Sequence, residues 1–161
     1  MDVSQAIRTR RSVREYTKED VTDEEIHEIL EAGSWAPSGL NNQPWRFKIL
    51  RGVEKAEIAK HTKYRGIIED APVCVAVFLD PKDSYDRTKD LQSIGACIQN
   101  MLLEAHNHGL GAVWLGEILN GRYEVQKALN IEKELMAVIT IGHQSVKTVI
   151  SRRKSLKKLL L

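Results

Sequence analysis

The chain has 161 residues, of which 42% are apolar and 29% are charged, and its formal net charge is +2. This length supports one domain with a hydrophobic core and is too short for two ordinary domains, so we expect a single domain over residues 1–161. The sequence shows no apolar run of the roughly 18 residues that cross a membrane, and no secretory signal at its N-terminus. We therefore expect a cytoplasmic protein without membrane contact.

Two helices are predicted in the first 35 residues. The first covers residues 3–9, and the second covers residues 23–32. Thr22 and Glu25 have the spacing of a capping box, which satisfies free backbone N–H groups at a helix start. Gly33 is expected to end this second helix, because glycine readily adopts the left-handed conformation of a C-terminal cap.

Helices and strands alternate irregularly after residue 45. Apolar periodicity predicts strands over residues 46–50, 73–79, 112–115 and 135–141, and helices over residues 54–60, 91–108 and 123–129. The continuous apolar run at 73–79 indicates a strand that is buried on both faces. Cys74 and Cys97 fall in apolar segments and are expected to be buried thiols. The predicted class is α+β, or mixed α/β, with one mixed sheet packed against a central helix.

Residues 36–45 form an unusual neutral loop. The segment reads Ala-Pro-Ser-Gly-Leu-Asn-Asn-Gln-Pro-Trp and carries no charge, whereas 29% of the chain is charged. It offers backbone N–H groups, a glycine that permits close approach, and neutral amide donors and acceptors. Such a set suits a flat polar heterocycle, and a purely structural turn is the alternative.

A cationic cluster lies upstream of this loop, at Arg10, Arg11, Ser12 and Arg14. In an extended segment alternate residues point the same way, so Arg10, Ser12 and Arg14 could line one anionic molecule. Arginine forks match phosphate oxygens, although a solvated run of charges would look similar. The chain has no Gly-x-Gly-x-x-Gly after a strand and no Walker loop, so a Rossmann or P-loop nucleotide site is not supported.

The last eleven residues are basic but interleaved with leucines. This pattern favours a tail that docks its leucines and directs Arg152 and Arg153 at a phosphate, so we expect no nucleic-acid partner. The five histidines are scattered along the chain. His106 and His108 would point away from each other on a helix, and we expect no metal site.

The arginine–serine cluster, the helix after it and the neutral loop, in this order, resemble the nitroreductase family of FMN enzymes. The resemblance covers nearly the whole chain and continues through Asp70-Ala71-Pro72-Val73, residues 98–105, residues 109–114, Ile141-Gly142-His143 and residues 153–156. It implies a three-layer fold with a central mixed β-sheet flanked by helices. It also implies an intertwined homodimer with two flavin sites at its interface.

The resemblance further implies a role for four groups of residues. The N-terminal group would hold the flavin: Arg10, Ser12 and Arg14, with Arg11 alongside. The loop residues would reach the flavin of the neighbouring subunit: Pro37, Ser38, Gly39 and Asn41. A third group would pass the ring near its reactive nitrogen: Leu115, Gly116 and Glu117. Arg153, with Arg152 beside it, would meet the phosphate. No catalytic side chain is expected, because the flavin carries the chemistry.

The implied activity is a ping-pong transfer from NADH or NADPH, through FMN, to a small oxidised acceptor such as a nitroaromatic, quinone or enone. Two alternatives remain. One is a flavin-binding or sequestering protein without turnover on the same dimer scaffold, and the other is a specialised flavin reaction such as dehalogenation or flavin breakdown.

Two features depart from the family pattern or leave it ambiguous. The link over residues 80–90 is shorter than in many relatives, which predicts a more open pocket or one closed by other elements. Three basic residues, Lys60, Lys63 and Arg65, compete for one position near the flavin.

Overall fold

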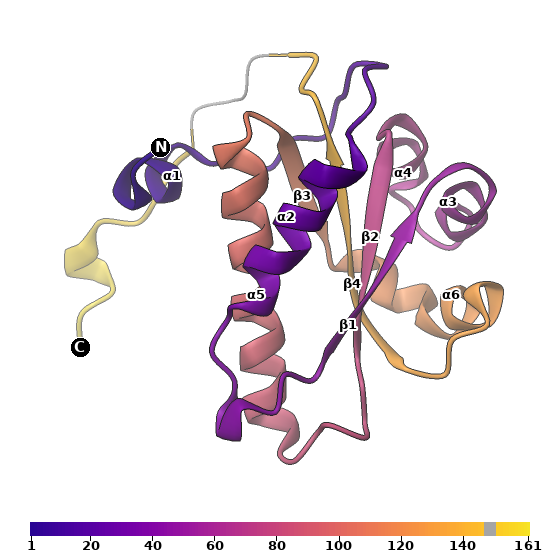
Figure 1. Ribbon diagram of the computed structural model, residues 1–161. Helices are drawn as coiled ribbons and strands as arrows, with labels where there is room; N and C mark the ends of the chain where they lie inside the picture. Colours follow the sequence, from indigo (N-terminus) through magenta and orange to yellow (C-terminus); the bar gives the residue numbers. More distant parts are fainter. Residues whose placement is uncertain (147–150) are drawn as a thin grey trace.

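The computed structural model of the protein describes residues 1–146 and 151–161 (Figure 1). The helices of the described residues are α1 (Val3–Thr9), α2 (Asp23–Ser34), α3 (Gly52–Ala59), α4 (Arg65–Asp70), α5 (Arg87–Asn107) and α6 (Arg122–Leu129). The strands are β1 (Trp45–Leu50), β2 (Val73–Leu79), β3 (Gly111–Leu115) and β4 (Glu134–Gly142). Three short 3-10 helices complete the chain: η1 (Gly39–Asn41), η2 (Glu117–Gly121) and η3 (Leu156–Lys158).

The strands form one sheet in the order β1-β2-β4-β3. Every pairing between these named strands is antiparallel, for example at Val75 opposite Ile139. The prediction of a mixed sheet is therefore wrong for the strands of the described residues. A parallel contact occurs there only as an isolated bridge between Ser12 and Ala112. Apolar periodicity reports how deeply a strand is buried, and it says little about the direction of the neighbouring strand.

The predicted three-layer architecture is confirmed, with the sheet between two layers of helices (Figure 1). Successive side chains of β2 point to opposite faces of the sheet. Val75 and Val77 pack in the core beneath α2 and α5, whereas Ala76 and Phe78 pack in the core beneath α3, α4 and α6. All seven residues of β2 are buried, as the apolar run predicts.

Helix α2 begins as predicted but ends later than predicted. The Thr22 hydroxyl accepts a hydrogen bond from the Glu25 amide, and the Glu25 carboxylate accepts one from the Thr22 amide. The helix then runs through Gly33 to Ser34, so the expectation that Gly33 ends it is wrong. A Cβ atom at Gly33 would lie 2.7 Å from Met101 Cγ, so this glycine lets α2 pack closely on α5.

Helix α4 was not predicted, because it has only six residues and no side chain caps its start. Helix α5 begins at Arg87, four residues earlier than predicted, because the Asp86 carboxylate caps it by accepting from the Lys89 amide. Cys74 and Cys97 are buried free thiols as predicted, and burial raises the pKa of each to about 12. Within residues 1–146 and 151–161, no helix has the length and apolar character needed to cross a membrane.

Candidate functional site

The predicted arginine cluster lies where α1 ends and the chain turns toward β3. Arg10 caps the C-terminus of α1, and the Arg11 guanidinium donates to the carbonyls of Arg8 and Arg10 at 2.8 and 2.7 Å. Ser12 then forms its bridge with Ala112 at the start of β3. The fold therefore holds Arg10, Arg11 and Ser12 beside one edge of the sheet.

The C-terminal tail brings a further cation to this cluster. Arg153 and Ser151 line a cavity of about 270 Å³ together with Arg8 and Arg11. Burial, and then the positive charges of Arg153 and Arg11, lower the pKa of Arg10. Arg152 is exposed and is not among the residues that line this cavity.

The arginines of this cluster have no carboxylate partner within the described residues. The ion pairs that arginines form in that part of the chain all lie elsewhere. The Nε atom of Arg10 is buried and lacks a hydrogen-bond partner there. Buried donors and converging like charges are costly unless they are paired. The cluster thus has unpaired donors that an anion could pair with, although Arg14 contributes only a long 3.4 Å contact to the Ser12 carbonyl.

The predicted neutral loop is tightly folded. Leu40 and Asn41 both have φ of 54°, and Gln43 has φ of 47°, in the left-handed region that residues other than glycine rarely adopt. The Ser38 hydroxyl accepts from the Gln43 amide at 3.0 Å. The Asn42 side chain donates to Asp90 Oδ1 at 2.7 Å, which fastens the loop to the first turn of α5. Held backbone strain of this kind is typical of binding sites.

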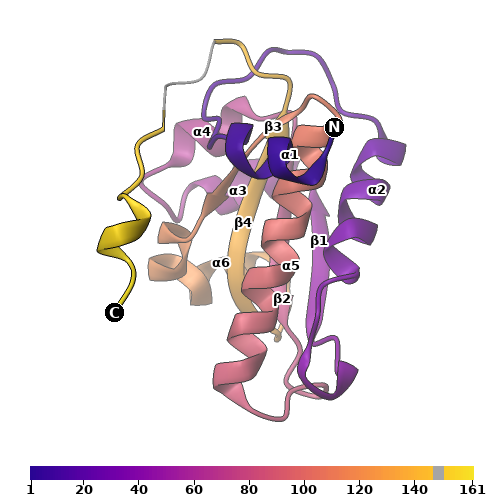
Figure 2. The same ribbon diagram turned by 90° about the vertical axis from the view of Figure 1, so that its left-hand side faces the viewer.

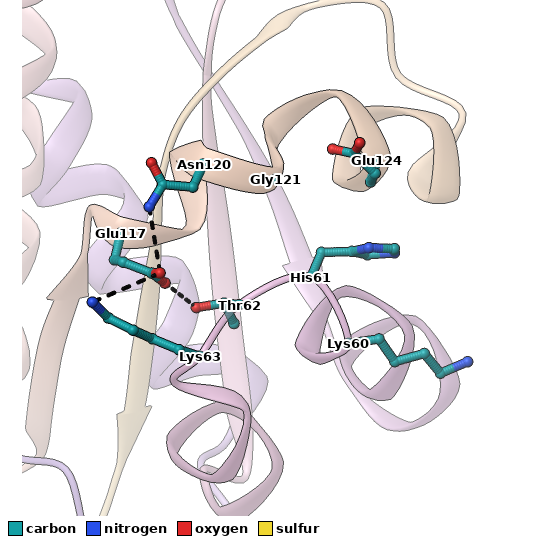
Figure 3. Close-up of a pocket in the computed structure, with 8 residues that line it drawn as sticks. All are labelled: Lys60, His61, Thr62, Lys63, Glu117, Asn120, Gly121 and Glu124. Carbon is teal, nitrogen blue, oxygen red and sulfur yellow. Dashed lines mark hydrogen bonds and ion pairs between the residues drawn. The ribbon is translucent and has the colours of Figure 1, made fainter.

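The third predicted group follows β3, at Leu115, Gly116 and Glu117. Figure 3 shows the cavity of about 440 Å³ beside it, between η2 and the link from α3 to α4. Glu117 accepts hydrogen bonds from Thr62 Oγ1 at 2.5 Å and from Asn120 Nδ2 at 3.4 Å. Its pKa is lowered, first by the hydrogen bond from Thr62 and then by Asn120 and Lys63. The Glu117 side chain is therefore held in place by hydrogen bonds that also favour its charged form.

The structure separates the three basic residues that competed for one position. Lys60 pairs with Glu57, and Arg65 pairs with Glu69. The ammonium of Lys63 lies 3.9 Å from the Glu117 carboxylate, whereas Lys60 points away from it (Figure 3). Lys63 is thus the member of this set that approaches the residues after β3.

Within one chain, the neutral loop lies far from the arginine cluster, whereas the residues after β3 lie closer to that cluster. The arginine cluster and the residues after β3 lie at two ends of one short strand, about 13 Å apart between Ala112 and Gly116 at 3.3 Å per residue. The neutral loop contacts α5 at Asp90, whereas α1 contacts it at His106, about 24 Å along the helix at 1.5 Å per residue. Figures 1 and 2 both show α1 and η1 at opposite ends of α5.

Sequence reasoning missed two residues that shape the loop region. Asp90 is fully buried and accepts from Asn42 and Ser84, and the Tyr85 ring packs against Gly39. The first turn of α5 is polar throughout, so nothing in the sequence marked Asp90 as a buried residue. The described residues contain no group of three or more histidine, cysteine or acidic side chains that could hold a metal ion.

These features define a three-layer α+β protein with a cluster of arginines at a sheet edge and a strained neutral loop. A model of the nitroreductase family matches residues 7–64 and 53–143 of the chain. A provisionally named NADH dehydrogenase/NAD(P)H nitroreductase of Methanothermobacter thermautotrophicus is 36% identical over 148 residues, which cover 89% of this chain and 78% of the relative. The chain belongs to the nitroreductase family and is an oxidoreductase of that family.

Solved structures and a more distant relative extend this result. A provisionally named nitroreductase from Desulfovibrio desulfuricans, solved in complex with FMN, is 48% identical and matches with a TM-score of 0.96 over 100% of this chain and 96% of its own. An iodotyrosine deiodinase of Thermotoga neapolitana is 26% identical over 162 residues, covering 83% of this chain and 84% of the relative. The predicted family is thus confirmed.

Proposed function

We propose that the protein is an FMN-dependent oxidoreductase that passes reducing equivalents from NADH or NADPH to a small oxidised acceptor, such as a nitroaromatic, quinone or enone, by a ping-pong reaction. The observation that carries the proposal is the cluster of arginines that lack a carboxylate partner within the described residues. It occurs in a chain that is 48% identical, over its full length, to a protein solved with FMN.

The arginine cluster fits the phosphate end of FMN. Arg10 has a buried Nε donor without a partner in the described residues, and Arg153 and Arg11 raise the positive potential around it. An FMN phosphate would accept from these guanidinium groups and relieve their mutual repulsion. Ser12 adds a hydroxyl donor and Arg14 a further cation, and Arg152 stands next to Arg153 in the exposed tail.

The residues after β3 fit the ring of the same FMN. When bound, FMN would supply the hydride and electron chemistry, so no nucleophile or general base is needed from the chain. The backbone of Leu115, Gly116 and Glu117 would lie along the ring and orient it. Lys63, which is held near the Glu117 carboxylate, would bring a positive charge to this end of the site.

The neutral loop would complete the site from a second copy of the chain. Because the loop and the arginine cluster lie about 24 Å apart along α5, one chain cannot bring both to a single mononucleotide. We therefore propose a homodimer in which Pro37, Ser38, Gly39 and Asn41 of each chain reach the FMN held by the other chain. The exposed apolar side chains of Trp35 and Leu40, next to this loop, are consistent with such an interface.

The experiment is a visible spectrum of the purified protein, followed by anaerobic addition of NADH and then of NADPH. We expect flavin bands that bleach with at least one donor and return when a quinone or nitroaromatic is added. Protein that binds no FMN after reconstitution would refute the proposal. The Arg153→Gln variant should bind FMN more weakly, and Lys127→Gln, which removes an exposed lysine on α6, serves as its matched control.

The similarity to an iodotyrosine deiodinase supports one second candidate, a reductive dehalogenation at the same flavin site. The same preparation tests it, because iodide release from an iodinated phenol would accompany reoxidation of the flavin. Flavin bands that resist both nicotinamide donors would instead favour a flavin-binding protein without turnover.

A further inference from the structure

A cavity of about 330 Å³ lies between the neutral loop and the first turns of α5, apart from the arginine cluster. It is lined chiefly by Pro37, Ser38, Gly39, Tyr85, Lys89 and Gln92. Its volume is at the lower end of the range for small-molecule sites and suits a single substituted aromatic ring. The wall opposite the loop comes from the short link over residues 80–86 and from α5.

Asp90 holds the two walls of this cavity together. Its side chain is fully buried, and its Oδ2 accepts from the Ser84 hydroxyl at 2.5 Å and from the Tyr85 amide at 3.1 Å. Its Oδ1 accepts from Asn42 Nδ2 at 2.7 Å, on the loop side. One carboxylate thus bonds to both the loop and the link. The short link is thereby fixed against the loop.

Tyr85 forms the aromatic side of the cavity. A Cβ atom at position 39 would overlap the Tyr85 hydroxyl and ring, so the glycine allows the tyrosine to lie directly on the loop backbone. The residue is nevertheless 44% exposed. A half-exposed tyrosine ring that is fixed at its hydroxyl edge can stack with a planar ligand.

Lys89 supplies the charge. Among the described residues that line the cavity it is the one with a charged side chain. Its Nζ lies 5.1 Å from the centre of the Tyr85 ring. The carboxylate of Asp86 is 3.9 Å away, at the limit of an ion pair, and such exposed pairs contribute little. Both contacts of the ammonium are solvent-exposed and weak, so it can exchange them for a ligand that lies on the tyrosine.

We propose that this cavity is the acceptor subsite and that it prefers planar aromatic acceptors that carry a negative charge, such as a carboxylate or phenolate. Tyr85 stacks with the ring of the acceptor, and Lys89 pairs with its anionic group. The inference rests on the proposed function, because the loop that forms one wall is the loop proposed to reach the FMN of the second copy. Lys89 and Tyr85 are thus specificity-determining residues rather than parts of the flavin chemistry.

The test measures binding directly, by equilibrium dialysis of FMN-loaded protein with 4-nitrobenzoate and with its neutral counterpart 4-nitrobenzamide. An exposed charge pair contributes up to about 1 kcal/mol, so we expect the wild-type protein to bind the benzoate about fivefold more tightly. Lys89→Gln should abolish this preference, and Lys89→Arg should keep it. Lys127→Gln removes a remote exposed charge and should leave the preference unchanged. Tyr85→Leu should weaken binding of both ligands alike, by about threefold or more.

Two results would overturn the inference. One is equal affinity of the wild-type protein for the two ligands, and the other is the same preference in Lys89→Gln as in wild type. Since Lys89 is exposed, its replacement does not threaten folding, and a matching flavin spectrum confirms this for each variant. A protein that binds FMN and is reduced by NAD(P)H, but shows no preference for the benzoate, refutes the subsite alone. Absence of FMN binding refutes the proposed function instead.

Discussion

Replacement of Asp90 by asparagine should lower the free energy of unfolding, because the neutral loop loses a hydrogen bond to α5. Ser84, Tyr85 and Asp86 all donate hydrogen bonds to Oδ2 of Asp90. We therefore expect the single oxygen of the asparagine amide to take the place of Oδ2. Its NH₂ group then faces Asn42 Nδ2, which loses a 2.7 Å hydrogen bond to a charged acceptor. Loss of such a bond costs about 1.5–3 kcal/mol. At about 2–4 °C per kcal/mol for a chain of this size, a loss near 2 kcal/mol lowers Tm by about 4–8 °C.

The pH dependence of this loss is set by the pKa of Asp90. Burial alone would raise that pKa, but hydrogen bonds from Ser84, Asn42 and two backbone amides outweigh it and lower the pKa below its ordinary value of 3.8. An acid whose pKa is lowered by folding contributes stability that is complete above its unfolded pKa and is lost as the pH falls through the folded pKa. Asparagine resembles the protonated acid, so the difference between the two proteins should shrink toward zero at low pH.

Urea unfolding at pH 7 and at pH 3, with one fixed protein concentration and with FMN absent, measures both quantities. The matched control is Asp86→Asn, in the same helix. Asp86 is an N-cap, where asparagine serves as well as aspartate, so its replacement should cost less than about 0.5 kcal/mol. An Asp90→Asn protein as stable as this control at pH 7 would refute the reasoning, and so would an undiminished loss at pH 3.

Three further outcomes follow from the described contacts. Arg153→Gln should reduce the rise in Tm that FMN produces in a thermal-shift assay, because a guanidinium of the anion cluster is lost; an unchanged rise contradicts its role. Gly121→Ala should cost about 1–3 kcal/mol in urea unfolding, since its Cβ would lie 2.5 Å from the His61 carbonyl oxygen, and wild-type stability would refute this contact. Cys74 and Cys97 should react with a thiol reagent only after denaturant is added, and rapid labelling of the native protein would contradict their burial.

The fold could be predicted where the signal is local. The capping box at Thr22 and Glu25 marks a helix start whatever the helix packs against, and the apolar run of β2 marks a strand in the middle of the layers. The sheet direction and the end of α2 could not be predicted in this way. In the sequence, Gly33 looks like a residue that ends a helix. Only the structure shows that it lies inside α2 and lets this helix pack closely against Met101.

The same distinction applies to the candidate site. The arginine cluster and the neutral loop stand out in sequence, because each is a contiguous segment of unusual composition. Asp90 does not stand out, since its role depends on Asn42, which lies 48 residues away, and on the short link that precedes α5. The sequence offered Lys60, Lys63 and Arg65 equally for the basic position near the flavin. The ion pairs of Lys60 with Glu57 and of Arg65 with Glu69 distinguish them from Lys63.

Flavin binding and chain association are coupled in the proposed site. If FMN contacts the arginine cluster of one chain and the loop of the other, then association raises its affinity, and FMN strengthens association by the same factor. Burial, and then repulsion from Arg153 and Arg11, lower the pKa of Arg10, and a bound phosphate would offset both costs, which acts in the same direction. Asp90 holds the loop in its strained conformation within a single chain, which would reduce the ordering cost of the proposed assembly. In the proposed dimer, one buried carboxylate would thereby support both the proposed acceptor cavity of its own chain and the flavin site of the other.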